Sequence, residues 1–596
     1  MGLEAMLQVN GKIVIFDLAL IGLAACSAFT SQNEHFTQQE RDRGQSSQKY
    51  SGAFIASTNI AWDIPWGCRD KLTSWKAIKA TKSLEISDNL TKNGTWPASS
   101  DFWDKFCLQA DPGEISGTIQ RDKNFVALAL SGGGMRAAVY SGAIMFELGR
   151  RQIMQDVDVI SSVSGGSIAA AYYGLSCDGI HCLETVENQG RCRWRENDQL
   201  KGNNRAIDPC EDYFSEIDKD LELRWIANWF FPDNIVSYWF TNYDRSDTMA
   251  EVMADNLFDT SQLGGEGFSF HDFNPRRPHI LINATDNTEV EGELFGNLKS
   301  GESIAGRFNF QFTHEDFAKV CSNLDRYPVA NAVMASSAYP VLFSFVTLTN
   351  QCGQYSESGI KIDGLNPTYR HVFDGGNSDN LGLLGLHGTL RKLARKIDLK
   401  AAPKTPDKTS EPAKLDKPDD VIIFQANASL GVPGRSKELS DTRGIIGRFF
   451  DTNIIDTTDV LMGIGYDNTH KETDNLLEHA AKNSRPVQRI DFRLESLQTI
   501  AYCNVRRGEK NYSKRVPEMC KAWDFIQNIG TRFSTDSKQI RYLRYAACKI
   551  TAHKLKKVCD AHPNAAGYIG KMCNPETTPE TAAETSKRCT AYLTGG

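Results

Sequence analysis

The sequence predicts an α/β fold in which helices cover a central, mostly parallel sheet in three layers. Short continuous apolar runs alternate with segments of helical periodicity, and such runs are typical of strands buried on both faces. The predicted strands are Phe125–Leu130, Val157–Ile160, His279–Asn283 and Asp420–Phe424. The chain of 596 residues is 40% hydrophobic and 24% charged, which suits one large core with smaller additions.

A glycine-rich turn follows the first predicted strand. Ser131–Arg136 reads SGGGMR and opens a predicted helix that ends at Arg150. Glycines at such a turn let backbone N–H groups approach an anion, and the helix N-terminus adds a favourable dipole. A P-loop is excluded because no Gly-Lys-Ser/Thr follows. A dinucleotide fingerprint G-x-G-x-x-A stays open at this point, with an acidic residue about 20 positions later. Its members would be Gly132, Gly134 and Ala137, with Asp156 or Asp158.

The next turn favours a nucleophilic serine. Val157–Ser167 runs as strand, sharp turn and helix start, and it places Ser164 in an S-x-S-G-G version of the nucleophile elbow. Small neighbours are needed there, because a side chain would collide with the crossing backbone. The predicted helix continues to Leu175. A dinucleotide fold does not require this turn.

A third motif presents a carboxylate. Val372–Asn377 is an apolar approach followed by Gly375 and Gly376, which free the backbone to present Asp374 at the edge of the sheet. A lone D-G-G is more often an ordinary turn. This motif becomes informative because the other two motifs precede it in the chain.

Taken together and in this order, the three motifs resemble those of the patatin-like phospholipase family: a G-G-G-x-R loop, a G-x-S-x-G elbow and a D-G-G/A. The resemblance extends to Ile282–Asp286, Met334–Pro340 and Gly530–Phe533. It covers roughly residues 121–398 and, more weakly, 420–545. It implies a three-layer patatin-like fold and hydrolysis of lipid acyl esters, such as phospholipids, without a metal or cofactor.

Carried over to this chain, the family pattern implies Ser164 as the nucleophile and Asp374 as its base. The implied oxyanion loop is Gly132, Gly133 and Gly134 with Arg136 beside it, and the elbow and D-G-G glycines are Gly165, Gly166, Gly375 and Gly376. The chain departs from the pattern at Ser162, where the elbow has a glycine. Since free Asp titrates near ~3.9, Asp374 is expected to be ionised at neutral pH and able to accept the serine proton. An acyl-enzyme on Ser164 would then be hydrolysed by water.

The N-terminal segment is typical of an exported lipoprotein. Ile13–Ala25 is apolar but shorter than the ~20 residues that span a bilayer, so it fits a signal-peptide core. It ends in Leu-Ala-Ala before Cys26, which resembles a lipobox whose cysteine is lipidated. Asp17 and Glu4 fit such a peptide poorly, and a buried N-terminal helix or strand is the alternative. We expect a protein anchored to the membrane of the bacterial envelope.

Cysteine usage also favours an oxidising compartment. There are 15 cysteines, and setting Cys26 aside leaves 14, an even number. The sequence does not fix the connectivity, but several cysteines lie close in sequence, as local disulfides would: 177 with 182, 192 with 210, 321 with 352, 503 with 520, 548 with 559, and 573 with 589. A zinc site is the competing interpretation, although no CxxC pair is present. Its ligands would be Cys177, His181, Cys182 and Cys192.

The predicted organisation has four parts. They are a signal peptide (1–26), a polar tether and lead-in (27–118), a catalytic domain (119–545) with a disordered insertion (399–419), and a Cys/Lys-rich appendage (546–596). The aromatic segments Trp225–Phe231 and Tyr238–Phe240 are predicted to lie in the core, with an interfacial patch that enters lipid as the alternative. A net charge of −7 gives no electrostatic footprint for nucleic acid.

Two functional alternatives remain at this stage. One is a general serine esterase or acyltransferase that uses the same two residues on a soluble acyl substrate. The other is a non-catalytic envelope lipoprotein that keeps the fold as a scaffold, against which the intact Ser164 and Asp374 argue. The sequence specifies neither head group nor oligomeric state.

Overall fold

The computed structural model describes most of the segments that carry the predicted motifs. They are residues 124–151, 153–175, 209–241, 243–258, 278–286, 327–340, 342–349, 369–387, 420–430, 487–501, 517–574 and 581–594, with a few shorter pieces between them. The expected signal peptide, the tether, the 399–419 insertion and the alternative zinc ligands lie outside the described residues.

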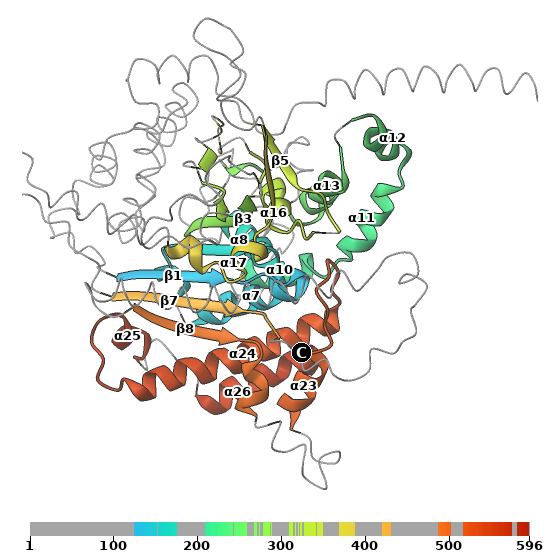
Figure 1. Ribbon diagram of the computed structural model, residues 1–596. Coiled ribbons are helices and arrows are strands. Elements are labelled where there is room, and N and C mark those ends of the chain that lie inside the picture. The colour runs from blue at the N-terminus through green and yellow to red at the C-terminus, as the bar shows by residue number, and fades with distance from the viewer. Residues whose placement is uncertain are drawn as a thin grey trace, which may run out of the picture.

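A mixed sheet forms the centre of the molecule (Figure 1), in the order β5-β6-β3-β2-β1-β7-β8 with β4 paired to β3. The central strands β3, β2, β1, β7 and β8 are parallel, whereas β4 and β6 run antiparallel to β3, and β5 antiparallel to β6. This confirms the predicted α/β fold with a mostly parallel sheet. The strands are β1 (Asn124–Leu130), β2 (Val159–Val163), β3 (His279–Asp286), β4 (Asn309–Gln311), β5 (Val346–Thr349), β6 (Tyr369–Asp374), β7 (Asp420–Asn427) and β8 (Val487–Arg493).

Both faces of the sheet are buried, as the apolar runs predict. Along β1, Val126 and Leu128 belong to the large core cluster that the helices build, whereas Phe125 and Ala127 belong to a second cluster on the opposite face. The second cluster is closed by leucines of the segment after β6, at positions 381, 383 and 386. Side chains alternate across a strand, so one continuous apolar run serves two cores.

The helices follow the strands in the expected alternation. After β1 comes α7 (Gly134–Arg150), and after β2 comes α8 (Gly165–Leu175). The others are η3 (Met154–Asp156), α10 (Pro209–Glu216), α11 (Leu221–Trp229), α12 (Pro232–Phe240), α13 (Arg245–Leu257), α16 (Val329–Ser336), α17 (Gly376–Asp379), α21 (Ser496–Ile500), α23 (Glu518–Ile526), α24 (Ser537–Ala561), α25 (Gly567–Met572) and α26 (Ala582–Thr594). Within the described ranges, none of them combines the length and hydropathy that a bilayer crossing needs.

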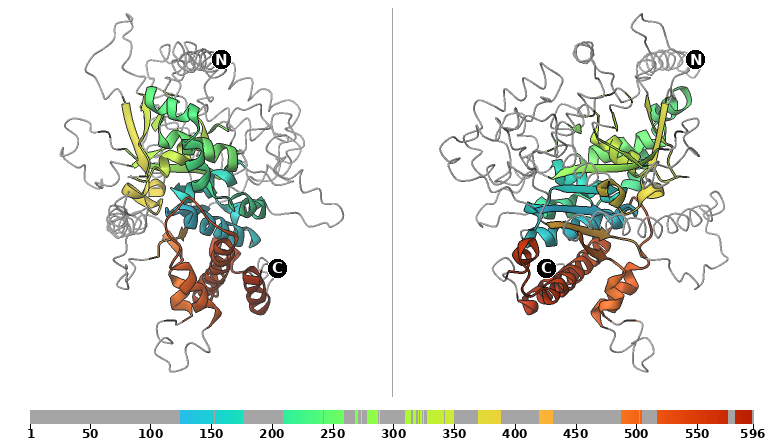
Figure 2. Two further views of the ribbon diagram at one scale, coloured as in Figure 1. Left: turned by 90° about the vertical axis from the view of Figure 1, so that its right-hand side faces the viewer. Right: turned by 60° about the vertical axis from the view of Figure 1, so that its left-hand side comes forward.

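The C-terminal helices lie together beside α7, as Figure 2 shows in orange and red. The expected boundary between residues 545 and 546 falls inside α24, whose Ala546, Ala547 and Ile550 belong to the large core cluster. A single core therefore runs through this boundary. The ion pair of Arg588 on α26 with Glu147 on α7, at 2.6 Å, ties the last helix to the same body.

Three disulfides lie in the described part of the chain. Cys503–Cys520 is a local pair, as expected. The expected pairs 548–559 and 573–589 are wrong, because Cys548 bonds Cys589 and Cys559 bonds Cys573. Cys548 and Cys559 both lie on α24, where 11 residues at ~1.5 Å each separate them by about 16 Å, far beyond disulfide reach.

Candidate active site

Ser164 occupies a strained turn between β2 and α8. It is the one non-glycine residue with positive φ, at 50°, among the residues that the structure describes. Its N–H donates to Ser336 Oγ at 2.8 Å, and this bond helps to hold the turn. Left-handed backbone costs an L-residue about 1–2 kcal/mol, so the fold maintains this conformation against its local preference. Ser164 therefore lies in a sharp turn directly after the end of the buried strand β2.

The elbow glycines are required by close approach. A Cβ on Gly165 would overlap the carbonyl oxygen of Gly134, and a Cβ on Gly166 would lie 2.7 Å from the carbonyl oxygen of Ser131. Both obstacles belong to the glycine-rich turn after β1, which crosses directly over the elbow. The sequence predicted that a side chain here would collide with the crossing backbone. The structure shows that the atoms it would meet are backbone carbonyl oxygens of this turn.

The departure from the family pattern at Ser162 has a simple structural explanation. The Ser162 side chain is fully buried, and its hydroxyl donates to the carbonyl oxygen of Leu281 on β3 at 3.0 Å. A buried hydroxyl with a partner carries no large desolvation cost. Serine therefore fits a position that the family pattern gives to glycine.

Asp374 lies at the end of β6 with its carboxyl group in contact with Ser164. The Ser164 hydroxyl donates to this carboxylate, and the N–H of Gly376 donates to Asp374 Oδ1 at 2.7 Å. The residue is 3% exposed. Burial raises its pKa to about 7, and the bonds from Gly376 and Ser164 oppose that rise. The expectation of a fully ionised aspartate at neutral pH is therefore corrected, since the group titrates near neutrality.

Ser336, at the end of α16, connects the two motifs, and no role was assigned to it from the sequence. Its hydroxyl accepts from Ser164 N–H and donates to the carbonyl oxygen of Asn283 at 2.6 Å, while its carbonyl accepts from Gly375 N–H at 3.1 Å. The hydroxyl also lies 2.9 Å from Ser167 Oγ. One buried residue thus fixes the turns that carry the serine and the aspartate.

The glycine-rich loop lies against Ser164. A Cβ on Gly132 would come within 3.3 Å of Ser164 Cβ, and the N–H of Gly132 donates to Asn380 O at 3.0 Å. That amide is thereby occupied. The next two residues, Gly133 and Gly134, have φ of 134° and 59°, and within the described parts of the chain their N–H groups have no acceptor. They are the donors of this loop that remain for a ligand.

Arg136 holds the loop in place. Its Nε donates to Ala428 O at 3.1 Å and its Nη1 to Ile529 O at 2.7 Å. The neighbouring N–H of Met135 donates to Arg532 O at 2.8 Å. The late motif around residues 530–533 therefore packs on the glycine loop, although almost 400 residues separate them.

Asp379 is a buried carboxylate that the sequence did not single out. It accepts the N–H groups of Leu384 at 2.6 Å and Leu381 at 3.1 Å. Burial raises its pKa to about 6, which these bonds and others from the same turn oppose. The turn that it organises carries Asn380, whose carbonyl receives Gly132 N–H. In the sequence, the only indication of this residue is that it is an acidic residue a few positions after the D-G-G motif.

His371 lies on the other face of β6 from Asp374. The strand alternates, so residues 371 and 374 point to opposite faces, and His371 Nδ1 lies 3.0 Å from Thr347 Oγ1 on β5. Its ring also lies 5.5 Å from that of Phe345. The opposite orientation expected from the sequence is confirmed.

The dinucleotide alternative does not fit this geometry. Asp156 and Asp158 precede β2, whereas the glycine loop follows β1, and β1 and β2 are parallel. The aspartates therefore lie at the opposite end of the sheet from the glycines. Asp156 pairs with Lys571 at 2.9 Å, and Asp158 accepts Val126 N–H at 2.9 Å. Within the described residues, no cluster of three or more His, Cys, Asp or Glu could hold a metal ion.

Comparison with known proteins finds a family that part of this chain resembles. The model of the patatin family, described as patatin-like phospholipase, matches residues 128–387. Among solved structures, human GIVD cytosolic phospholipase A2 aligns at 12% identity over 55% of this chain and 45% of its own, with a TM-score of 0.26. The match thus spans less than half of that enzyme.

Two bacterial structures align over more of the chain but with lower scores. VipD from Legionella pneumophila aligns at 11% identity over 79% of this chain and 91% of its own, with a TM-score of 0.20. A chain of the SpcU–ExoU complex of Pseudomonas aeruginosa has the same identity and coverage, with a TM-score of 0.18. A search of curated protein sequences found no match. The family model thus shows that residues 128–387, less than half of the chain, are similar to the patatin-like phospholipases.

Proposed function

We propose that this protein is a phospholipase A-type lipid acyl-ester hydrolase, with Ser164 as the nucleophile and Asp374 as its base. One observation carries the proposal: the hydroxyl of a serine held at positive φ interacts with a buried carboxylate and stabilises its charged form. A serine hydroxyl becomes a good nucleophile when a neighbouring group takes its proton. The proposal assigns that role to a carboxylate in place of histidine.

The raised pKa of Asp374 suits the role. A carboxylate that titrates near 4 is a weak base, whereas one with a pKa of about 7 can accept a proton and later return it at neutral pH. Burial produces this property, because it disfavours the charged form. The same desolvation makes the bond from Ser164 stronger than it would be in water.

The proposed reaction has two steps. Ser164 Oγ attacks the ester carbonyl carbon while its proton passes to Asp374, which then protonates the leaving alcohol oxygen as the ester bond breaks. Water next attacks the acyl-enzyme, gives a proton to Asp374 and releases the fatty acid as Ser164 recovers its proton. The N–H groups of Gly133 and Gly134 are proposed to stabilise the oxyanion of both steps, and one such donor is typically worth ~3 kcal/mol.

We also propose that the protein is an exported lipoprotein anchored through Cys26. The lipobox-like sequence before this cysteine supports the proposal. So do the disulfides Cys503–Cys520, Cys548–Cys589 and Cys559–Cys573, since such bonds persist in oxidising compartments. Mass spectrometry of the protein from bacterial membranes tests it, and an unmodified Met1 or Met6 as the first residue contradicts it.

A fluorophosphonate probe tests the active site without a guess about substrate. We expect the wild-type protein to be labelled at Ser164 and to release fatty acid from phosphatidylcholine, and Ser164→Ala to do neither. A matched Ser586→Ala variant, at an exposed serine on α26, should still be labelled. Labelling without hydrolysis of any phospholipid, but with hydrolysis of soluble esters, would identify a general esterase instead.

A further inference from the structure

Eight large apolar side chains are exposed on α11, α12 and the turn between them. We call them the aromatic patch: Leu223, Ile226, Phe230, Phe231, Ile235, Tyr238, Trp239 and Phe240. Phe230 is 69% exposed, and Trp239 and Phe240 are each 73% exposed. The sequence-based prediction of a core position is therefore wrong for the six of these residues that lie within Trp225–Phe231 and Tyr238–Phe240. Contiguous apolar surface of this kind is rare on soluble proteins and marks a site of interaction.

Helix α11 is apolar on two opposite faces. Leu221 and Trp225 face the body of the protein, while Leu223, Ile226 and Phe230 face outward. At ~100° per residue, the three outward residues fall within about 60° of the helix circumference. A helix that is apolar on two opposite faces needs apolar surroundings on both sides. The protein supplies those surroundings on one side of α11.

The patch is firmly attached to the body of the protein. Trp225 Nε1 donates to Arg245 O at 3.0 Å, and the Trp225 ring packs on Phe343 at 5.1 Å between centroids. Asp220 caps α11 by accepting Leu223 N–H at 2.9 Å. The exposed face is therefore held in place by the buried face of the same helix.

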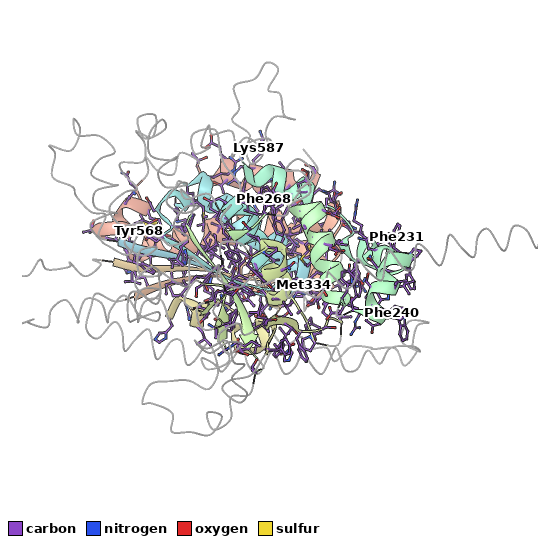
Figure 3. The ribbon with its side chains drawn as sticks, turned by 90° about the horizontal axis from the view of Figure 1, so that it is seen from above. Phe231, Phe240, Phe268, Met334, Tyr568 and Lys587 are labelled. Atoms are coloured by element: carbon purple, nitrogen blue, oxygen red, sulfur yellow. A yellow bond between two sulfur atoms is a disulfide. The ribbon has the colours of Figure 1, made fainter. Side chains whose placement is uncertain are left out.

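Helix α12 is held in turn by α11. The ring of Trp229 packs edge-on against Tyr238 at 4.7 Å, and Asn234 Nδ2 donates to Asn228 O at 2.8 Å. Trp239 and Phe240 lie at the end of α12 and point to the exterior. Figure 3 shows Phe231 and Phe240 at one end of the described part of the chain, far from Tyr568.

The patch lies toward the carboxyl end of the parallel strands, which is the end that carries the candidate active site. Ser164 follows β2, which is parallel to β1, and Figure 1 shows the arrowhead of β1 pointing toward the side where α11 and α12 project. The chain continues from α12 into α13, which packs on α16, the helix that carries Ser336. The exposed aromatic surface and the serine thus belong to one end of the molecule.

The composition of the patch matches a lipid–water interface. Tryptophan, tyrosine and phenylalanine are favoured there, because they combine apolar rings with few groups that need water. The sequence of residues 221–241 holds three charged residues, Glu222, Arg224 and Asp233. With so little charge, the segment has no need of anionic lipid and little reason to prefer a charged protein partner.

We propose that the aromatic patch is a docking surface that seats the protein on a phospholipid bilayer. Its apolar side chains enter the boundary between head groups and acyl chains, and the carboxyl end of the sheet, with Ser164, then faces the membrane. The inference rests on the proposed function, because it specifies an aggregated lipid surface as the form in which the substrate is met.

Vesicle binding tests the docking surface separately from catalysis. The full chain would carry Cys26→Ser, which removes the proposed anchor, and Ser164→Ala, which prevents hydrolysis, in every sample. We expect this parent to co-sediment with dioleoylphosphatidylcholine vesicles, with little change at about 0.5 M salt. Adding Trp239→Ser and Phe240→Ser should weaken binding by about tenfold or more.

A matched pair separates apolarity from aromatic packing. Trp239→Leu with Phe240→Leu removes the same rings but keeps apolar surface, and it should bind within about threefold of the parent. Circular dichroism and thermal unfolding would establish that all three proteins are folded. Equal binding by the serine pair and the parent, or no binding by the parent, overturns the proposal.

Two further measurements distinguish the remaining outcomes. If sedimentation shows that the parent is a dimer and that the serine pair makes it a monomer, the patch is a self-association surface and the docking proposal fails. Protein with intact Ser164 is tested in parallel on a soluble short-chain ester. Hydrolysis of that ester without vesicle binding by the parent refutes docking alone, whereas vesicle binding without hydrolysis of any ester refutes the proposed function alone.

Discussion

Replacing Asp374 by asparagine should abolish activity and, at neutral and alkaline pH, make the protein more stable. The amide has nearly the shape of the carboxyl group. Its Oδ1 can still accept the N–H of Gly376, and its NH₂ can donate to the hydroxyl of Ser164, so the local packing is kept. The amide cannot accept the serine proton, and we expect turnover to fall at least about a thousandfold.

The stability gain follows from the raised pKa of Asp374. Relative to its ordinary pKa of 3.8, the group titrates at about 7 in the folded protein, so the native state binds its proton more tightly than the unfolded state does. The associated stability is fully present below pH 3.8 and is lost as the pH rises through about 7. About three units at ~1.4 kcal/mol each set an upper limit of about 4 kcal/mol. The amide of the Asp374→Asn variant has no proton to lose in this range, so the variant avoids this loss.

The measurement is thermal or urea unfolding of both proteins at pH 4, 6 and 8 without reductant. We expect the two to be similar near pH 4, and the free energy of unfolding of Asp374→Asn to exceed that of wild type by about 2–4 kcal/mol at pH 8. Asp379, with a raised pKa of about 6, is present in both proteins and cancels in the difference. Asp560→Asn on α24, at an exposed carboxylate, is the matched control and should show no such gain.

Activity gives a second and independent readout of the same group. The acid limb of kcat/KM for wild type should rise through about pH 7, because only the ionised form of Asp374 can act as the base. Parallel pH profiles of unfolding for wild type and Asp374→Asn would refute the desolvated carboxylate. A rate that is constant from about pH 5 to 8 would refute its role as the base.

Three more outcomes are expected. His371→Ala should lose less than about tenfold in activity, or ~1.4 kcal/mol, because its ring lies on the opposite face of β6; a loss comparable to that of Ser164→Ala in a folded variant would make a histidine the base. Ser336→Ala should lower the free energy of unfolding by about 1–3 kcal/mol and reduce kcat, since it leaves Ser164 N–H buried without its acceptor; unchanged values of both would contradict the connecting role. Cys589→Ser should lower the stability by about 3–4 kcal/mol through loss of a disulfide that closes 41 positions of chain, and an unfolding curve insensitive to reductant would count against that bond.

The central strands were predictable because they are buried on both faces. β1, β3 and β7 are continuous apolar runs and were located within a few residues. β2 was predicted to end at Ile160 but extends to Val163, because its last polar residues are small serines whose burial the pattern does not reveal. β8, with the sequence VQRIDFR, was missed, since an edge strand has no need of apolar residues on both faces.

The motifs predicted which turns lie together at the candidate site but not the residues that support them. The elbow, the glycine loop and Asp374 are local sequence patterns, and the structure brings them together. Ser336 carries no pattern of its own, because its importance comes from contacts with residues 53 and 172 positions away. The pKa of Asp374 was also out of reach, since it depends on burial that only the assembled fold creates.

For the aromatic segments, the sequence pattern was recognised but its location was predicted wrongly. Leu221 and Trp225 are packed against the body as a core prediction requires, yet Phe230 and Trp239, in the same run of sequence, are exposed. An apolar segment in the sequence indicates that its side chains need apolar surroundings. It does not indicate whether those surroundings are the protein core or a lipid.

The site is a set of locally unfavourable features that distant segments hold together. The positive φ of Ser164 and the buried charge of Asp374 each lower the stability of the folded protein, and neither turn is closed by its own neighbours alone. Ser164 depends on Ser336, and the glycine loop depends on Asn380 and on Arg532 from the C-terminal part of the chain. These partners join the strained serine and the desolvated carboxylate into one rigid unit. The C-terminal segment around Arg532 is therefore part of the candidate active site, although the matched family model ends at residue 387.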